Sequence, residues 1–354
     1  MNATIRDVAE AAGVSISSVH IALSGKKGVS ESTRTLIKEV AESLGYQPNK
    51  NAASLKRKRQ KILIVLPGVK GDNRFFYPPM WHGIHDFVEA HVANAEFIEI
   101  PYYSQQHDEI LHRVHELLHS GEINGYLSAG HLEVISEGDW NYIKSNNIPV
   151  VFLNSYRENT DYLCCVECNY EVIGRTMAEL ITSRIEPYGS IFLLAGNPKF
   201  HSHSQIVRGF DAYLNENNIK NLVYKNFSWS IENANYMHIL REVMRPDIAA
   251  CASVFSQGTF LLGQALEEAG KMDIFSVGSD LAEVTQERIR KGVFNNVIQK
   301  NPYAQGYYGI RVLTDYLVNG KEPESKIVYV GADVIFKSNL PMYEKSNVGA
   351  MIFY

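Results

Sequence analysis

Residues 4–24 read TIRDVAEAAGVSISSVHIALS, a pattern typical of two short helices joined by a glycine turn. Thr4 can cap the first helix, and Asp7 completes an approximate capping box. Gly13 ends that helix, and Ser15 is placed to cap a second one that runs to about Ser24. Helical spacing predicts an inward apolar stripe on each helix, formed by Ile5, Val8, Ala9 and Ala12 and then by Val19 and Leu23.

A third helix is predicted after the glycine-rich segment 25–28. Ser30 can cap it, Gly45 stops it, and its apolar stripe is Ile37, Val40 and Leu44. Two short helices joined by a tight turn, with a third closing the core, form a helix-turn-helix. The alternative interpretation is a helical cap on a larger domain.

The distribution of charge separates the head of the chain from the rest. Residues 1–60 hold ten Lys and Arg against five Asp and Glu, a net charge of +5, whereas the whole chain carries −5. Residues 61–354 therefore carry −10. A basic head on an acidic body predicts that the head meets a polyanion, and this favours DNA binding over a helical cap.

Composition also excludes several classes of protein. The polar start, residues 1–7, leads into no apolar signal segment, and no apolar run approaches the ~18–20 residues of a membrane helix. The four cysteines do not form a disulfide framework, and no Gly-rich phosphate loop calls for a nucleotide cofactor. We therefore expect a cytoplasmic protein with no cofactor and no membrane partner.

From residue 61 onward, β-rich apolar runs alternate with amphipathic stretches of helical length. The runs are Ile62–Leu66, Phe97–Ile100, Tyr126–Ser128, Val150–Leu153, Ile191–Leu194, Ala249–Phe255, Ile274–Val277 and Ile327–Val330. The helical stretches are Phe76–Ala93, Asp108–Ser120, Tyr170–Ile185, Ser204–Asn217, Thr259–Ala269 and Pro302–Asn319. Such alternation predicts an α/β fold with a doubly wound parallel sheet, and the length suits two lobes. Ligands of these folds bind beyond the carboxyl ends of the strands, so we expect a site in the cleft between the lobes.

The head resembles the DNA-binding domain of LacI-type (lactose-repressor) regulators. The likeness extends from Thr4–Ser15 through Val29–Arg34 and Leu44–Asn49 to Ala52–Leu55. The remainder is similar to the effector domain of that family, which shares its fold with periplasmic sugar-binding proteins. The weaker landmarks there are Asn73–Phe76, Ile148–Val151, Arg208–Phe210, Val277–Asp280 and Gln299–Pro302. The resemblance implies a DNA-binding head with a hinge helix over residues 1–60 and an effector-binding and dimerisation domain over 61–354.

For the head, the resemblance implies that the second helix enters the major groove and reads base edges. The residues expected at the bases are Ile16, Ser17, His20 and Ile21, of which Ile21 can contact thymine methyl groups but donates no hydrogen bond. The alternative for His20 and Ile21 is a helix face packed on protein. Contacts to the DNA phosphates are expected from Ser15, Ser30, Thr33, Tyr46 and Asn49. Thr4 and Ala52 are also expected among the DNA-binding residues.

The segment Asn51–Leu55 matches the hinge helix of the family. It is too short to be helical alone, because nucleating a helix is costly, so it should order on DNA when two copies pack together. Leu55 matches the wedge that kinks the duplex from the minor groove. The basic run 56–59 should add salt-sensitive affinity. These features imply a homodimer on a pseudo-palindromic double-stranded DNA operator.

For the effector domain, the resemblance implies a small sugar-like ligand held between aromatic rings and polar side chains. The expected ligand-binding residues are Asn73, Phe75, Phe76, Asn154, Arg208, Gln257, Asp280 and Gln299, with Phe227 or Trp229 supplying a second ring. The family usually places a clamping Arg three residues before the Gly-Phe pair, where this chain has Ile206. The alternatives are core packing for Phe75 and Phe76 and, for Asp280, a cap on a helix over Ala282–Gly292.

Two further motifs are of types that can indicate metal or redox chemistry. The run His115-Glu116-Leu117-Leu118-His119 is an H-E-x-x-H, but we interpret it as an outer helix with Leu111, Val114 and Leu118 buried, and we predict no catalytic metal site. The alternative, given His112 nearby, is capture of a metal at this surface. Cys165 and Cys168 form a C-x-x-C within a strand-like run, which favours core cysteines over a redox pair.

The sequence thus predicts a ligand-controlled DNA-binding transcriptional regulator, acting as a repressor, and not an enzyme. The rival hypotheses are a transport-type solute-binding protein and a metalloenzyme built on His115 and His119. Residues 1–60 and the missing export signal favour the regulator over the first of these.

Overall fold

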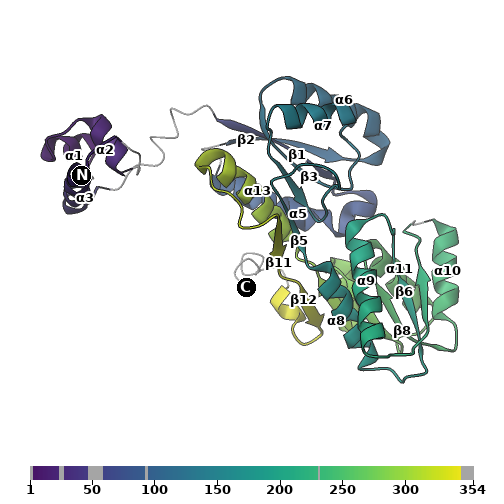
Figure 1. Cartoon of the computed structure of the whole chain (residues 1–354). Helices are drawn as coiled ribbons and strands as arrows, with labels where there is room; N and C mark the ends of the chain where they lie inside the picture. The colour runs from purple at the N-terminus through teal and green to yellow at the C-terminus, as the bar shows by residue number, and fades with distance from the viewer. Residues whose placement is uncertain (1–2, 24–27, 47–58, 92–94, 230–231, 344–354) are drawn as a thin grey trace. The chain divides into compact units, whose positions relative to one another are not determined.

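The computed structural model of the chain describes residues 3–23, 28–46, 59–91, 95–229 and 232–343 (Figure 1). The chain divides into two compact units, Met1–Lys58 and Arg59–Tyr354. Each unit has a hydrophobic core of its own. Among the described helices, none combines the length and the apolar character that a membrane span needs.

The first unit contains the three predicted helices, α1 (Ile5–Ala11), α2 (Ile16–Leu23) and α3 (Glu31–Ser43). The capping box at Thr4 and Asp7 is present, and Ser30 caps α3 by accepting a hydrogen bond from the backbone N–H of Thr33. Ser15 Oγ likewise accepts from the Ser18 N–H at 3.1 Å. The helices therefore begin where the sequence predicts.

The core of the first unit is formed by Val8, Ala9, Val19, Ala22, Ile37 and Ala41. The other predicted stripe residues, Ile5, Ala12, Leu23 and Val40, pack against it partly buried, and only Leu44 does not. Ala22 is buried in α2 and Leu23 only partly so, while Ala41 replaces Leu44, which is 41% exposed at the end of α3. Small alanines on the inner faces let three short helices approach closely. The existence of this core argues against the alternative of a helical cap on a larger domain.

The second unit is built from two six-stranded sheets that define two lobes. The first lobe has the strand order β11-β5-β4-β3-β1-β2, with β1 (Gln60–Pro67), β2 (Ala95–Tyr102), β3 (Ile123–Ala129), β4 (Val150–Leu153), β5 (Cys164–Cys168) and β11 (Ile327–Val330). The second lobe has the order β12-β10-β9-β8-β6-β7, with β6 (Ser190–Leu194), β7 (Val223–Asn226), β8 (Ile248–Ser253), β9 (Phe275–Ser279), β10 (Asn296–Gln299) and β12 (Asp333–Phe336). All pairs are parallel except β10 with β12.

Helices pack against both sheets. In Figure 1, α6 (His107–His119) and α7 (Glu137–Ser145) lie together on one side of the first sheet, and α5 (Tyr77–His91) and α13 (Pro302–Asn319) on the other. The second lobe carries α8 (Tyr170–Thr182), α9 (His201–Glu216), α10 (Asn233–Val243), α11 (Ser256–Glu268) and α12 (Glu283–Lys291). This is the predicted two-lobed α/β fold, and it is confirmed.

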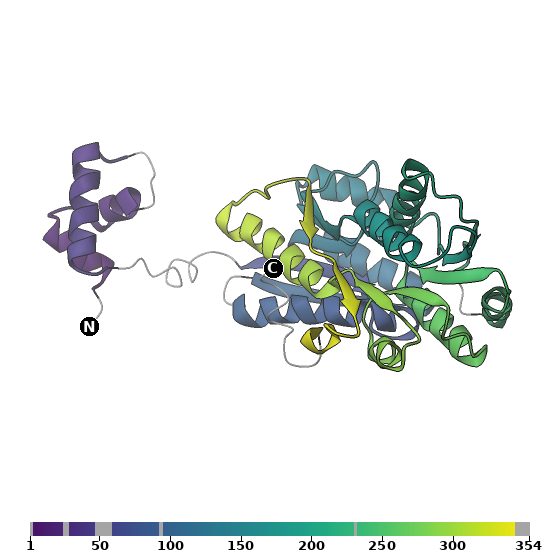
Figure 2. The same ribbon diagram turned by 90° about the horizontal axis from the view of Figure 1, so that it is seen from below.

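The chain crosses between the lobes three times. It passes from β5 to α8, returns from β10 to α13, and passes again from β11 to β12, the strands that follow one another in yellow in Figure 2. The sequence patterns did not predict β7, β10, β12, α7 and α10, which are short or polar. They predicted β5 only as a strand-like run. The predicted helix over Ala282–Gly292 is present as α12.

Helices α8 and α9 approach each other through a pair of glycines. A Cβ at Gly174 of α8 would lie 1.9 Å from the Ile206 carbonyl oxygen, and one at Gly209 of α9 would lie 2.0 Å from that of Glu171. Neither helix can move away without opening the core of the second lobe, because Ile206 and Phe210 of α9 are fully buried there.

We expect Gly209→Ala to lower the free energy of unfolding by about 1–3 kcal/mol, the usual cost of overpacking. Gly138→Ala on α7 is the matched control, since its new Cβ would meet only Ser136 Oγ at 3.6 Å. The control should be neutral or more stable by about 0.5–1 kcal/mol, because alanine favours a helix. Urea denaturation measures both variants. Equal stability of the two would contradict the close approach of α8 and α9.

Candidate functional site

A cavity of about 490 Å³ lies in the second unit where strands of both lobes end. The residues that line it lie at or after the carboxyl ends of β1, β2, β3 and β4 in the first lobe and of β6, β7, β8, β9 and β10 in the second. Parallel α/β sheets bind ligands at this edge, where loops and helix N-termini present polar groups. The position of the cavity therefore agrees with the cleft predicted from the sequence.

Two of the lining residues occupy matching positions in the two lobes. Asn154 follows β4 and Asp280 follows β9, and both have a left-handed backbone, with φ of 64° and 63°. Asn and Asp tolerate this conformation better than other non-glycine residues do. Each backbone N–H is still held by the neighbouring strand, that of Asn154 by Val166 and that of Asp280 by Ile298. The first residue after each strand is thus fixed at the cavity.

Asp280 forms a buried ion pair with Lys300, the residue after β10. Lys300 Nζ lies 3.0 Å from Asp280 Oδ2 and also donates to the Val254 carbonyl oxygen at 3.0 Å. Burial raises the pKa of the Asp280 carboxyl, and the charge of Lys300 opposes that shift. The alternative role of Asp280 as a helix cap is wrong, since α12 is capped at Ala282 with no side-chain hydrogen bond.

Several hydrogen-bond acceptors at the cavity have no protein partner. The Lys300 ammonium lies 3.0 Å from Asp280 Oδ2 but in poor hydrogen-bond geometry, and among the described protein atoms no other residue donates to either carboxylate oxygen. Gln257 Oε1 is likewise buried without a donor. An unpaired buried acceptor is costly, and this cost is removed by a ligand that donates O–H or N–H groups.

Aromatic rings form much of the remaining wall. Phe200 lies 5.9 Å from Trp229 and 5.1 Å from the ring of His131, while Phe76 meets Tyr77 edge to face at 5.3 Å. Burial lowers the pKa of His131 to about 4 and that of His203 to about 3. His203 also accepts a hydrogen bond at Nδ1 from the Asn197 N–H. Both imidazoles are therefore neutral at physiological pH.

The structure places only some of the predicted ligand-binding residues at the cavity. Those that line it are Asn73, Phe76, Asn154, Gln257, Asp280 and Trp229. Phe76 also contributes to the core of the first lobe, so the core-packing alternative holds for it in part. The sequence missed Lys300, His131, Phe200 and His203, although each of them closely follows a strand end or begins a helix after one.

Four of the predicted ligand-binding residues do not line the cavity, and their contacts and exposure explain why. Phe75 stacks on Phe260 of α11 at 5.1 Å and so joins the two lobes. The side chain of Arg208 is 68% exposed on α9 and pairs with Glu171, and Phe227 is 48% exposed. The Gln299 amide oxygen accepts a hydrogen bond from the Leu281 N–H beside the cavity. Ile206, at the position expected for a clamping Arg, is buried in the core, and Ser202 and His203 one turn earlier line the cavity instead.

In the first unit, the residues predicted to read bases lie on the outer side of α2. Ile16 is 44% exposed, Ser17 and His20 are exposed, and Ile21 is partly covered. Arg34 Nη1 donates to the carbonyl oxygens of Ile21 and Ala22, which satisfies the end of that helix. An exposed apolar side chain beside polar ones is the surface expected of a helix that enters a groove.

The predicted backbone contacts are distributed around the same helices. Thr4, Ser15 and Ser30 are exposed and already cap α1, α2 and α3. Thr33 is partly buried beside Ser30, and Tyr46 packs against the core of the unit. Asn49, Ala52 and Leu55 lie outside the described residues.

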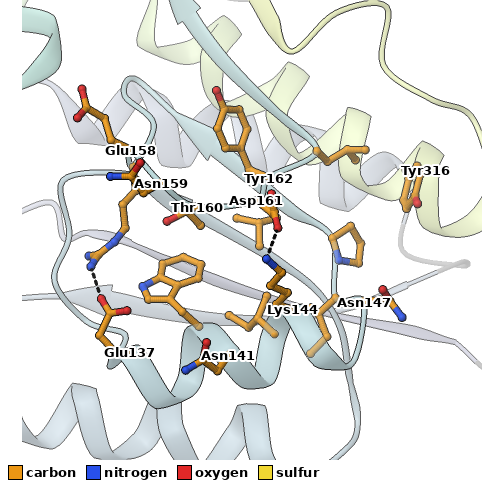
Figure 3. A pocket seen from close by; sticks show the side chains of 17 residues that line it. Glu137, Asn141, Lys144, Asn147, Glu158, Asn159, Thr160, Asp161, Tyr162 and Tyr316 are labelled. Carbon is orange, nitrogen blue, oxygen red and sulfur yellow. Dashed lines mark hydrogen bonds and ion pairs between the residues drawn. The ribbon is translucent and has the colours of Figure 1, made fainter.

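A second cavity, of about 720 Å³, lies at the opposite edge of the first lobe (Figure 3). It is lined by α7, by the amino ends of β4 and β5, and by residues 157–163. Two ion pairs cross its wall, Arg157 with Glu137 and Lys144 with Asp161, both at 3.1 Å. Four of its five charged lining residues are paired in this way, and the cavity lies away from the carboxyl ends of the strands, so we regard the first cavity as the candidate site.

The two remaining sequence motifs lie on α6 and on β5. Helix α6 carries the H-E-x-x-H run and buries Ile110, Val114 and Leu118, with Ile110 in place of the predicted Leu111. All four cysteines are buried and free, and burial raises the pKa of the Cys164 thiol to about 11 and that of Cys168 to about 12. The prediction of core cysteines is confirmed.

Comparisons with known proteins agree with this architecture. Residues 4–49 match the family of bacterial regulatory proteins of the lacI type, and residues 140–322 match the periplasmic binding protein domain. The chain is 27% identical to catabolite control protein A of Priestia megaterium over 62% of this chain and 63% of that protein. It is 24% identical to the protein of the same name from Staphylococcus epidermidis over 92% and 95%. A solved structure of a putative LacI transcriptional regulator from Bacteroides fragilis superposes with a TM-score of 0.69 at 19% identity, over 81% of this chain and 100% of that one.

The fold, the head and these matches define a DNA-binding transcriptional regulator with a periplasmic-binding-protein-like sensor domain. The chain belongs to the lacI family of bacterial regulatory proteins.

We expect the second unit to lose stability as the pH falls below about 6.5, because the unfolded chain then protonates His203 while the folded cavity does not. His203→Asn keeps an acceptor for the Asn197 N–H but cannot titrate. The variant should therefore reduce the slope of unfolding free energy against pH by at most about 1.4 kcal/mol per unit between pH 6.5 and 4. Chemical denaturation across that range measures the slope. His112→Gln, at an exposed position of α6, is the control, and equal slopes in both variants would refute the buried neutral His203.

Proposed function

We propose that this regulator represses transcription by binding a pseudo-palindromic DNA operator as a homodimer, and that a neutral, sugar-like ligand in the 490 Å³ cavity controls its affinity for the operator. The observation that carries the ligand class is the set of unpaired acceptors, Asp280 and Gln257, beside aromatic walls. Hydroxyl groups supply the missing donors, and the C–H face of a sugar ring packs on aromatic side chains.

The charges of the cavity favour a neutral ligand over an anionic one. Asp280 and Lys300 are its charged lining residues, and they neutralise each other. The two lining imidazoles are neutral, since burial lowers the pKa of both. The volume lies within the range of ~300–1,000 Å³ that is usual for small-ligand sites.

The operator is proposed to be read by α2. Ile16, Ser17, His20 and Ile21 would face base edges in the major groove, and the capping residues of the three helices would lie at phosphates. The basic balance of residues 1–60 supports this assignment. Two copies are needed, because a single three-helix head covers one half-site only. The homodimer also follows from the proposed role of Leu55 as a paired minor-groove wedge.

Control of DNA binding requires that the ligand prefer one arrangement of the protein. A ligand between two lobes joined by three crossings can bind more tightly at one relative position of the lobes than at another. Only this difference in ligand affinity can change the affinity of the protein for DNA. The regulator would act in the cytoplasm, where its DNA is, and would perform no chemistry on the ligand. A transport-type binding protein is the alternative, but it would leave the DNA-reading head without a purpose.

Asp280→Asn should raise the dissociation constant of a bound monosaccharide at least about tenfold, because a charge-assisted acceptor becomes a weaker neutral one. Arg208→Ala should leave it unchanged, since Arg208 lies on the outside of α9. Isothermal calorimetry with the sugar that most raises the thermal midpoint of the wild type measures both. Because Asp280→Asn leaves the Lys300 charge buried without its partner, circular dichroism and a thermal melt first establish that this variant is folded. Operator affinity of the folded variants without sugar should change little. Unchanged sugar affinity in Asp280→Asn would remove Asp280 from the site.

Deleting residues 1–60 should abolish operator binding and leave a folded second unit, which has its own cores. In the full chain the logarithm of operator affinity should fall linearly with the logarithm of salt concentration, because Lys and Arg release counterions from phosphates. Fluorescence anisotropy with a labelled duplex measures both effects. Operator binding by the truncated chain at full affinity would show that the head does not read the DNA.

A further inference from the structure

Three metal-ligating side chains converge on the first lobe, outside both cavities. His115 and His119 lie one turn apart on α6, and Asp139 lies in the first turn of α7. His115 Nδ1 is 2.7 Å and His119 Nε2 is 3.1 Å from the same oxygen, Asp139 Oδ1. The three potential ligand atoms all lie within 4.8 Å of one another.

This spacing is close to that of ligands around a small divalent cation. Zinc binds imidazole nitrogen and carboxylate oxygen at ~2.0–2.2 Å, so neighbouring ligand atoms of a tetrahedral site are ~3.3 Å apart. The separations of 2.7 and 3.1 Å between Asp139 Oδ1 and the two imidazole nitrogens are shorter than that value by about 0.6 and 0.2 Å, so the His115 ring would have to move outward slightly. A cation would replace the two N–H protons that now point at the carboxylate, with little movement of either helix.

The carboxylate of Asp139 is fixed from its other side. Ser136 donates to Asp139 Oδ2 from its backbone N–H at 3.2 Å and from its hydroxyl at 2.6 Å. These bonds form the capping box of α7 and leave Oδ1 directed at the imidazoles. The Asp139 side chain is 2% exposed, and none of the described Lys or Arg residues forms an ion pair with it. A buried carboxylate that faces two imidazoles and no Lys or Arg is a favourable place for a metal ion.

The two imidazoles are held in position and remain accessible. The His119 ring packs between the rings of His115, at 4.3 Å, and Tyr142 of α7, at 4.1 Å. The side chains of His115 and His119 are 52% and 38% exposed, so an ion can enter from solvent and keep a water ligand. Rings that are already ordered lose less entropy when they bind a metal.

We propose that His115, His119 and Asp139 form a zinc site that links α6 to α7. Nitrogen and oxygen ligands in this combination suit Zn²⁺, and Co²⁺ and Ni²⁺ can replace it. The site binds the ion without hydrolytic chemistry, because Glu116, the base position of the motif, is exposed and pairs with His112 at 3.3 Å. The opposite face of α7, with Glu137, Trp140 and Lys144, lines the 720 Å³ cavity, so the ion would stiffen the helix that forms that wall (Figure 3).

The test uses the full chain without an affinity tag, titrated with ZnCl₂ by calorimetry and with CoCl₂ by visible absorption. We expect one Zn²⁺ per chain, an intense tetrahedral Co²⁺ band that Zn²⁺ abolishes, and a higher thermal midpoint with Zn²⁺. His115→Gln and His119→Gln should each weaken binding at least tenfold and remove the band. Both substitutions are at exposed rings, and glutamine can still donate to Asp139, so the variants should fold.

His112→Gln is the matched control, because it removes an exposed imidazole one turn earlier on the same helix. It should bind Zn²⁺ as the wild type does. Absence of Zn²⁺ binding to the wild type would overturn the proposal. So would an equal loss of affinity in all three variants, since this would indicate general capture by surface histidines.

Discussion

The ion pair between Lys300 and Asp280 connects the fold of the second unit to its candidate site. Both residues come directly after neighbouring parallel strands, and both are almost fully buried. Lys300 also donates to the Val254 carbonyl, and its own carbonyl oxygen accepts from the Gln305 amide and from the Cys168 thiol. Lys300 therefore bonds to the ends of β8 and β9, and also to Cys168 and Gln305 in two of the segments where the chain passes between the lobes. Removing either charge would leave the other buried and unpaired, which typically costs about 3–5 kcal/mol.

The same pair determines what the cavity can bind. Lys300 neutralises Asp280 without giving it a directed hydrogen bond, so the carboxylate oxygens remain available as acceptors. Asn154 presents an amide from the equivalent position of the first lobe, and the Tyr170 hydroxyl donates to its side-chain oxygen. Polar groups from both lobes thus meet one ligand. A ligand that bridges them is bound more tightly when the lobes are correctly spaced, and this is the physical requirement for a switch.

The sequence predicted this architecture well where local chemistry determines the structure. The caps at Thr4, Ser15 and Ser30 fixed the helices of the head, and apolar runs located most strands. The sequence did not predict the positions of side chains that are determined by tertiary contacts. Phe75 pairs with Phe260 across the lobes, a contact that no local pattern reveals. The four ligand residues taken from family resemblance and then misplaced, Phe75, Arg208, Phe227 and Gln299, show that matching a motif does not fix the direction of a side chain. Lys300 was missed because lysine is rarely buried unless it is paired.

The central claim is that occupancy of the cavity and occupancy of DNA are energetically coupled. The most direct test compares two ratios. The first is the ratio of the dissociation constants of the stabilising monosaccharide for the free protein and for its operator complex. The second is the ratio of the operator dissociation constants without and with the sugar. Linkage requires the two ratios to be equal. We expect the two ratios to be equal to each other and different from one. A sugar affinity that is identical in the presence and absence of operator would contradict it.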